Sequence, residues 1–180
     1  MPTILSHPVV PLSMALMAGR KEVPGRLLAA GIAGSILPDL DVIGLKLGVP
    51  YADVFGHRGF FHSLIFALAV ATLGALYHRK LKAKFGMALV FLFASVASHG
   101  LLDAATDGGL GVALLSPFSN HRYFFSWHPI AVSPLSMARI LTERFRLVFI
   151  SELKWVWFPF LSIGTTGYLM RRTRGCLRGD

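Results

Sequence analysis

The feature that most constrains this chain is a series of long apolar runs. Residues 60–77 and 85–102 each reach the length of about 17 to 25 residues that a membrane-spanning helix needs. A third run, residues 155–170, follows Lys154 and begins with tryptophans of the kind that anchor a helix at the membrane interface. Charged residues make up only 15% of the whole chain, so a cleaved signal peptide does not explain the pattern. The chain is therefore predicted to be an integral membrane protein.

The N-terminal third is less regular. Residues 8–18 are apolar but short, and the small-residue run 27–37 stops at Pro38. Joined to residues 42–47, the second run becomes long enough to span, with Pro-Asp-Leu-Asp at 38–41 in its middle. Irregular backbone at membrane depth is tolerated only where protein surrounds it or where it lines a cavity. We predict a broken or re-entrant helix there.

The stretch between residues 103 and 154 is rich in Gly, Ser, Pro and aromatic residues, and a long connection of this kind is usually functional. Within it, residues 135–150 place three arginines among apolar positions, which predicts an amphipathic helix at the interface. The fold class is thus an all-α, polytopic membrane bundle of about four to five hydrophobic helices, some short or broken, plus this interfacial helix. The expected divisions of the single domain 1–180 are a metal-site core at 5–125, an outer loop and amphipathic helix at 126–152, a transmembrane helix at 153–170 and a basic cytoplasmic tail at 171–180.

Charge and cysteine content exclude several functions. The net charge is +9, but the cations flank apolar runs instead of lining polar, aromatic-studded surfaces, so we expect contact with membrane lipids and no nucleic acid. Cys176 is the only cysteine, which rules out an internal disulfide framework and a Cys-rich zinc site.

The cations also predict an orientation. Eleven of the 18 fall in three short segments that share one side if five hydrophobic elements alternate: Arg20, Lys21, Arg26, Arg79, Lys80, Lys82, Lys84, Arg171, Arg172, Arg174 and Arg178. The positive-inside rule places these segments and the C-terminus in the cytoplasm. Carboxylates divide the other way, since all except Glu22 and Asp180 fall on the opposite, extracytoplasmic side.

Histidine and aspartate residues collect at that opposite side. Four hydrophobic elements deliver such a residue to their outer ends, namely His7, Asp39, Asp41, His57, His62, His99 and Asp103. Ionisable groups near hydrocarbon are costly and normally serve a function. His99 and Asp103 are four residues apart and share a helix face, and Gly59 gives the 57–62 loop the freedom to bring its two histidines together.

Imidazole and carboxylate ligands without thiolate suit zinc, iron or manganese. The candidates outnumber the three protein ligands of a single catalytic zinc, so two or more divalent metal ions are expected, with zinc favoured by the ligand types. Such centres activate water and clamp both oxygens of a phosphoester displacement. We predict that Asp39 and Asp103 bridge metals or neutralise charge, and that Arg58 stabilises an anionic leaving group.

The order of these motifs resembles a known family. His7, then Pro-Asp-Leu-Asp at 38–41, then His57-Arg58-Gly59-x-x-His62-Ser63, then His99-x-x-x-Asp103 and Ser116-Pro117-Phe118 are similar, over about residues 5–125, to the YdjM-type family. Its members are described as LexA-regulated inner-membrane proteins and as metal-dependent hydrolases, the second description being itself inferred from their ligands. The resemblance implies a helical fold distantly similar to zinc-dependent phospholipase C. It also implies the ligands His7, Asp39, His57, His62, His99 and Asp103, with Asp41 as a ligand or a partner of one.

Each of these residues also has a plainer interpretation. His7, Asp39 and Asp41 stand where helix-capping residues stand, and His99 with Asp103 is compatible with a structural pair. Arg58 is equally suited to contacting lipid head groups. Asp107, His121 and His128 in the outer loop are further candidates for a ligand, a general acid or a lid.

Three functions follow from the pattern. The leading hypothesis is a membrane-bound metal-dependent hydrolase of an ester or phosphoester in a lipid or envelope substrate. The alternatives are a metal or proton transporter, since intramembrane His and Asp also build ion paths, and a non-catalytic protein stapled by a structural metal.

Overall fold

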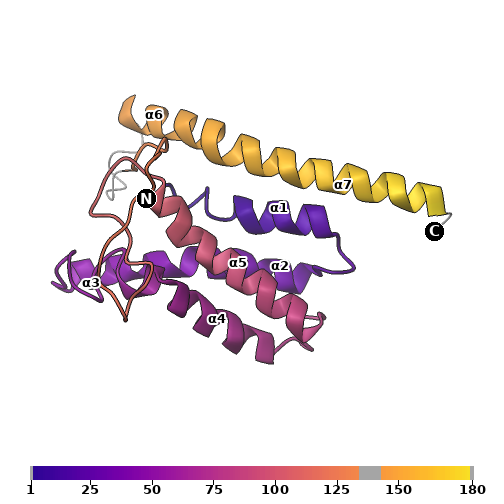
Figure 1. The fold of residues 1–180 in the computed structure, drawn as a ribbon, viewed down its shortest axis with the longest axis horizontal. Helices are drawn as coiled ribbons and strands as arrows, with labels where there is room; N and C mark the ends of the chain where they lie inside the picture. The colour runs from indigo at the N-terminus through magenta and orange to yellow at the C-terminus, as the bar shows by residue number, and fades with distance from the viewer. Residues whose placement is uncertain (1, 134–142, 179–180) are drawn as a thin grey trace.

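Five apolar helices lie side by side, and each runs antiparallel to the next in sequence (Figure 1). They are α1 (Val9–Ala18), α2 (Gly25–Ile36), α4 (Leu64–Leu76), α5 (Phe85–Ala104) and α7 (Phe158–Arg178). The computed structural model describes residues 2–133 and 143–178, the last four of them as backbone alone, and within these ranges it contains no β-strand. The predicted all-α class is confirmed.

The second hydrophobic element is broken where its sequence predicts. Helix α2 ends at Ile36, a 3-10 turn follows at Leu37–Asp41, and α3 (Val42–Lys46) resumes the helical path. Pro38 has no N–H and its ring crowds the preceding turn, which ends the α-helix. The tighter turn faces both aspartates into the protein, because Asp39 and Asp41 are buried while Leu40 between them is exposed.

Helices α4 and α5 form a hairpin with a small-residue interface. Ser63 begins α4 by accepting a hydrogen bond from the Phe66 N–H at 3.1 Å. Ala67, Ala71 and Ala75, spaced one turn apart, are buried. Small side chains let the two backbones approach closely. In lipid the hydrophobic effect does not drive helices together, so this close packing is what makes them associate. Large apolar residues on these helices point outward, among them Leu68, Leu73, Leu76 and Val90.

The C-terminal region is one continuous helical run. Helix α6 (Glu143–Glu152) passes through a π-helical turn at Leu153–Trp157 directly into α7, and Figure 1 shows one long rod. The predicted amphipathic segment 135–150 is thus seen from residue 143 onward as the start of the C-terminal helix, and its residues 135–142 lie outside the described ranges. The predicted tail is helical as far as Arg178. Gly164 and Gly167 pack directly on Ser13 and Met17 of α1.

Three helical stretches are long and apolar enough to cross a membrane: Gly25–Lys46, Phe85–Ala104 and Glu143–Arg174. The three basic segments meet at one end of the bundle. There Arg26 donates to the Lys80 carbonyl at 3.2 Å, and Arg171 donates to the Leu16 carbonyl at 3.1 Å. The N-terminus, α3 and the last turn of α5 lie at the other end (Figure 1).

A loop from residues 105 to 133 covers this other end. It contains two isolated β-bridges, Thr106 with Ile130 and Val112 with Tyr123. It is tied to the segment before α4 by hydrogen bonds from Ala113 N–H to the Arg58 carbonyl and from the Leu64 N–H to the Leu114 carbonyl, each 3.0 Å. The loop and the residues between α3 and α4 therefore form one cap over the bundle.

Candidate metal centre

All seven predicted ligands lie together at the capped end of the bundle. His7 precedes α1, Asp39 and Asp41 occupy the 3-10 turn, His57 and His62 lie just before α4, and His99 and Asp103 lie near the end of α5. Every one is buried, and Asp39, at 9%, is the most exposed. Side chains from four chain segments therefore converge inside the cap.

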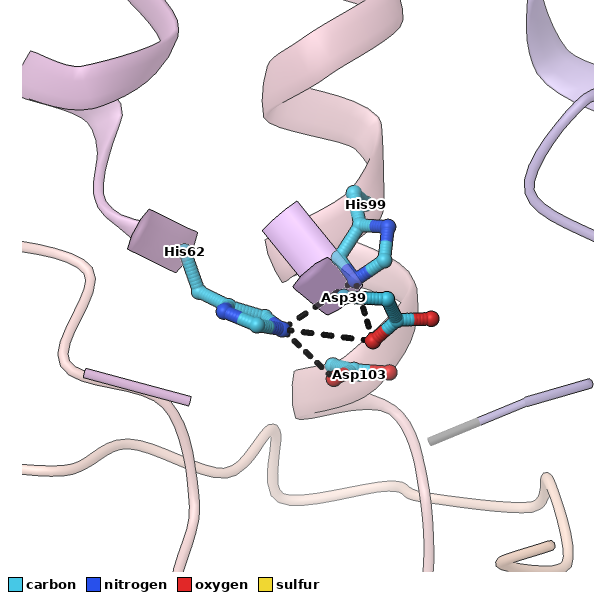
Figure 2. A group of neighbouring side chains, drawn as sticks. All are labelled: Asp39, His62, His99 and Asp103. Atoms are coloured by element: carbon cyan, nitrogen blue, oxygen red, sulfur yellow. Dashed lines mark hydrogen bonds and ion pairs between the residues drawn. The ribbon is translucent and has the colours of Figure 1, made fainter. Parts of the chain in front are cut away.

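Four of them form the larger of two groups, shown in Figure 2. Asp39, His62, His99 and Asp103 each offer a ligand atom, and these atoms all lie within 4.8 Å of one another. The Nε2 atom of His62 is 3.1 Å from His99 Nε2 and 3.4 Å from Asp103 Oδ2. His99 Nε2 is 3.3 Å from Asp39 Oδ1. Two imidazoles and two carboxylates thus point at one small volume.

A second group shares His62 with the first. It consists of Asp41, His57 and His62, with ligand atoms again within 4.8 Å of one another. His57 Nδ1 lies 2.6 Å from Asp41 Oδ1. His62 Nδ1 lies 3.1 Å from Asp41 Oδ2, as an ion-pair contact without hydrogen-bond alignment. Each ring nitrogen of His62 faces a different group.

His99 is oriented by the backbone. Its Nδ1 lies 2.7 Å from the Ser35 carbonyl oxygen, which can only accept, so Nδ1 carries the proton and donates. In the neutral ring Nε2 then presents its lone pair to the cluster. Metal-binding histidines usually have their second nitrogen held in this way.

The cluster is short of hydrogen-bond partners. Within the described residues, the buried side-chain nitrogen and oxygen atoms without a hydrogen bond are all here: both nitrogens of His7, both oxygens of Asp39 and of Asp103, Arg58 Nε and His62 Nδ1. A buried polar group left unpaired costs about 1–3 kcal/mol, and more if it is charged. A divalent cation would satisfy the carboxylate oxygens and the imidazole lone pairs together. The residues present therefore fit a metal of the zinc, iron or manganese type.

His7 lies at the edge of the cluster and in neither group. Its ring stacks on His99 with a centroid distance of 3.7 Å, and its Nε2 is 3.9 Å from Asp39 Oδ2. Burial lowers the pKa of His7 to about 3, with repulsion from His99 acting in the same direction. A neutral imidazole stacked on a neighbour is compatible with a ligand that approaches only when metal is present.

Arg58 lies between the cluster and the covering loop. Its side chain is 1% exposed, and its Nε is 3.2 Å from Asp103 Oδ2. It also donates to the Gly108 carbonyl at 2.7 Å and to Thr106 Oγ1 at 3.0 Å. The guanidinium is thus bound to Asp103 and the covering loop, and it is too deeply buried to reach head groups.

The other sequence candidates lie outside the cluster. Asp107, His121 and His128 are exposed in the covering loop. Asp107 accepts a hydrogen bond from the Val132 N–H, and His128 Nδ1 contacts the Phe125 carbonyl. His78 lies at the basic end, where its Nδ1 contacts the Ala83 carbonyl at 3.1 Å.

Two residues that the sequence did not single out hold segments together at this end of the bundle. Arg122 donates to the carbonyls of His57 and Tyr51, each at 3.0 Å, and its guanidinium lies over the Tyr51 ring. Burial raises the pKa of Tyr51 and lowers that of Arg122. Nothing in the sequence indicates this loop-to-loop contact.

The second is Glu152, which is fully buried at the end of α6. It accepts hydrogen bonds from the Thr3 N–H, from Thr3 Oγ1 at 2.6 Å and from Ser6 Oγ at 2.7 Å. It therefore fixes the segment that carries His7. A lone carboxylate beside an apolar run is a signal that could have identified it.

Comparison with known proteins agrees with this picture of a membrane protein. The chain matches the family model described as YdjM inner membrane protein over residues 1–174. It is 47% identical over 160 residues to the inner membrane protein YbcI of Escherichia coli K12, covering 88% of this chain and 92% of that one. It is also 31% identical over 94 residues to the uncharacterized protein YvsG of Bacillus subtilis 168, covering 48% of this chain and 56% of the relative. No solved structure matches. The chain belongs to the YdjM family of inner membrane proteins.

Proposed function

We propose that this protein is a metal-dependent hydrolase of an ester or phosphoester in a lipid or envelope molecule. The observation that carries the proposal is the set of buried carboxylate and imidazole atoms without a hydrogen bond that His7, Asp39, His62 and Asp103 contribute. Such a set is expensive to maintain in a fold unless it binds a cation.

The residues divide into two sets of ligands. Asp39, His62, His99 and Asp103 would hold one metal, and Asp41 and His57, sharing His62, would hold or orient a second. A divalent metal bound there supplies a Lewis acid that polarises the ester or phosphoryl oxygen and lowers the pKa of water. Zinc is our preferred identity because nitrogen and oxygen ligands suit it.

The protein's own groups shape this centre. Arg58 balances the charge of Asp103 and keeps that carboxylate aimed at His62. Asp41 contacts both His57 and His62 and sets their rotation. Asp39 has the most exposed ligand side chain of the two groups, 7% against 1% for His57 and 0% for the rest, so a substrate would approach on its side.

We further propose that the centre faces the extracytoplasmic side. The three basic segments meet at the opposite end, and cations of this kind mark the cytoplasmic side. Labelling of intact cells with an impermeant maleimide tests it. Asn120→Cys combined with Cys176→Ser should be labelled without lysis, and the native Cys176 only after lysis. The reverse pattern would contradict the orientation.

A structural metal is the second candidate, and the burial of the ligands favours it. In a closed centre every metal position is taken by protein. The transporter alternative has less support, because the buried ionisable groups among the described residues all lie at the capped end and form no path through the bundle.

Hydrolysis by the purified, zinc-loaded protein separates these functions. Phosphatidylglycerol, phosphatidylethanolamine and a chromogenic phosphodiester are suitable substrates, with His62→Ala as the inactive variant and His78→Ala as the matched control. We expect turnover by the wild type and by His78→Ala only. Bound zinc without turnover of any substrate would favour the structural role, and zinc flux into proteoliposomes would favour transport.

A further inference from the structure

A groove lies at the opposite, basic end of the bundle, between α1, α2 and α7. Its volume is about 410 Å³. Its wall is apolar over most of its length, with Leu12, Ala15 and Leu16 from α1 and Leu28 from α2. Arg20 and Arg171 also line it. It is distinct from the metal centre, since no candidate ligand takes part in it.

Arg171 is held in a fixed position by the end of α1. Its Nη1 donates to the Leu16 carbonyl at 3.1 Å and to the Met17 carbonyl. These carbonyls have no N–H partner within the helix because α1 ends there. Gly19 makes room for the guanidinium, since a Cβ at this residue would lie 2.6 Å from Arg171 Cζ, and its φ of +86° also favours glycine. The guanidinium also lies over the Tyr168 ring, and within the described residues its other nitrogens donate no hydrogen bond to the protein.

The positive charge of the groove is not neutralised by protein. Arg20 is exposed and makes no ion pair or hydrogen bond within the part of the chain that the structure describes. Glu22, the only carboxylate in the turn between α1 and α2, does not line the groove. Two guanidinium groups therefore stand beside an apolar wall at the end of membrane-spanning helices.

We propose that this groove binds one anionic phospholipid. The phosphate lies between Arg20 and Arg171, and an acyl chain follows the wall formed by Leu12, Ala15 and Leu28. An acyl chain gains little by leaving bulk lipid for an apolar groove, so the two arginines decide which lipid is bound, and they favour a net negative head group. Basic pockets between helices at a membrane surface are suited to such lipids.

Native mass spectrometry of the detergent-purified full chain with added phosphatidylglycerol or phosphatidylcholine tests the proposal. The wild type should retain phosphatidylglycerol in preference to phosphatidylcholine. Arg20→Gln combined with Arg171→Gln should lower phosphatidylglycerol retention roughly tenfold. The matched control, Arg172→Gln combined with Arg174→Gln, removes the same charge from the same region outside the groove and should change retention less than twofold.

Two further variants distinguish loss of lipid binding from loss of folding and test the apolar wall. Arg20→Gln alone removes no hydrogen bond or ion pair within the described residues, yet it should lower phosphatidylglycerol retention several-fold. Ala15→Phe narrows the groove without changing charge and should also lower retention. Equal losses in the groove variant and the matched control would show a general surface-charge effect and overturn the proposal. Equal retention of both lipids by the wild type would overturn it as well. Neither outcome depends on whether the metal centre is catalytic.

Discussion

The two ends of this bundle treat charge in opposite ways. At the capped end, three aspartates, four histidines and Arg58 are buried and lie within a few ångströms of one another. At the basic end, the cations are exposed and bind carbonyl groups or face the surroundings. A buried charge destabilises the fold unless it is paired or bound to a cation, whereas an exposed charge changes the stability of the fold little. The capped end therefore holds charges that need a partner or a bound cation, and the basic end holds charges that the surroundings can solvate.

The backbone between the helices also differs between the two ends. Short turns join the helices at the basic end, while the capped end gathers the N-terminal segment, the break in the second hydrophobic element, the residues before α4 and the long loop 105–133. Irregular backbone is concentrated where the candidate ligands converge. Substitutions at the two ends should accordingly have very different consequences.

The largest effect is expected from His62→Ala. This histidine belongs to both ligand groups, so its loss should lower zinc affinity more than about 100-fold, beyond the effect of losing an outer partner. Competition titration with a chromogenic zinc chelator measures it. His78→Ala, at the basic end, should leave affinity unchanged, and similar losses in both variants would refute the difference between the ends.

Arg58→Met should destabilise the fold strongly. It leaves Asp103 buried without its cation, and breaking a buried ion pair in this way costs about 3–5 kcal/mol. Thermal unfolding in detergent, followed by circular dichroism, should show a large loss in the metal-free protein and a smaller one after zinc is added. Equal losses in both states would mean that Asp103 is not a ligand.

Asp41→Asn should have an intermediate effect. The carboxylate contacts His57 and His62, and partners of this kind change metal affinity by about 10–100-fold. The same chelator titration applies, with Asp107→Asn in the exposed loop as the matched control. An unchanged affinity in Asp41→Asn would remove this carboxylate from the centre.

The smallest effect is expected at the basic end. Arg26→Gln removes one exposed hydrogen bond to the Lys80 carbonyl and should change the free energy of unfolding by no more than about 1 kcal/mol. Chemical denaturation in mixed micelles can measure it. A loss comparable to that of Arg58→Met would show that the basic end also holds the fold together.

Much of this organisation could be predicted from the sequence. Apolar run lengths identified the helices, and Pro38 marked the break because proline cannot continue an α-helix. The convergence of the ligands followed from alternation of the helices, which puts His7, His62 and His99 at one end. These inferences rest on local rules, which do not depend on how distant segments pack.

The remainder depends on tertiary contacts. The continuity of α6 with α7 was not foreseen, because a basic amphipathic segment beside an apolar one is equally suited to lying along the membrane. The contacts of Arg122 and Glu152 join segments far apart in the chain, and no spacing rule relates them. Arg58 was expected to face a substrate, but its position beside Asp103 depends on the fold of the loop at 106–108.

The central claim is that the buried His and Asp cluster binds metal. The most direct test is elemental analysis of the detergent-purified wild type beside the double variant His62→Ala and Asp103→Ala. We predict at least one zinc, iron or manganese ion per wild-type chain and a content near background in the variant. Wild-type metal at background, or equal metal in both proteins, would contradict the claim.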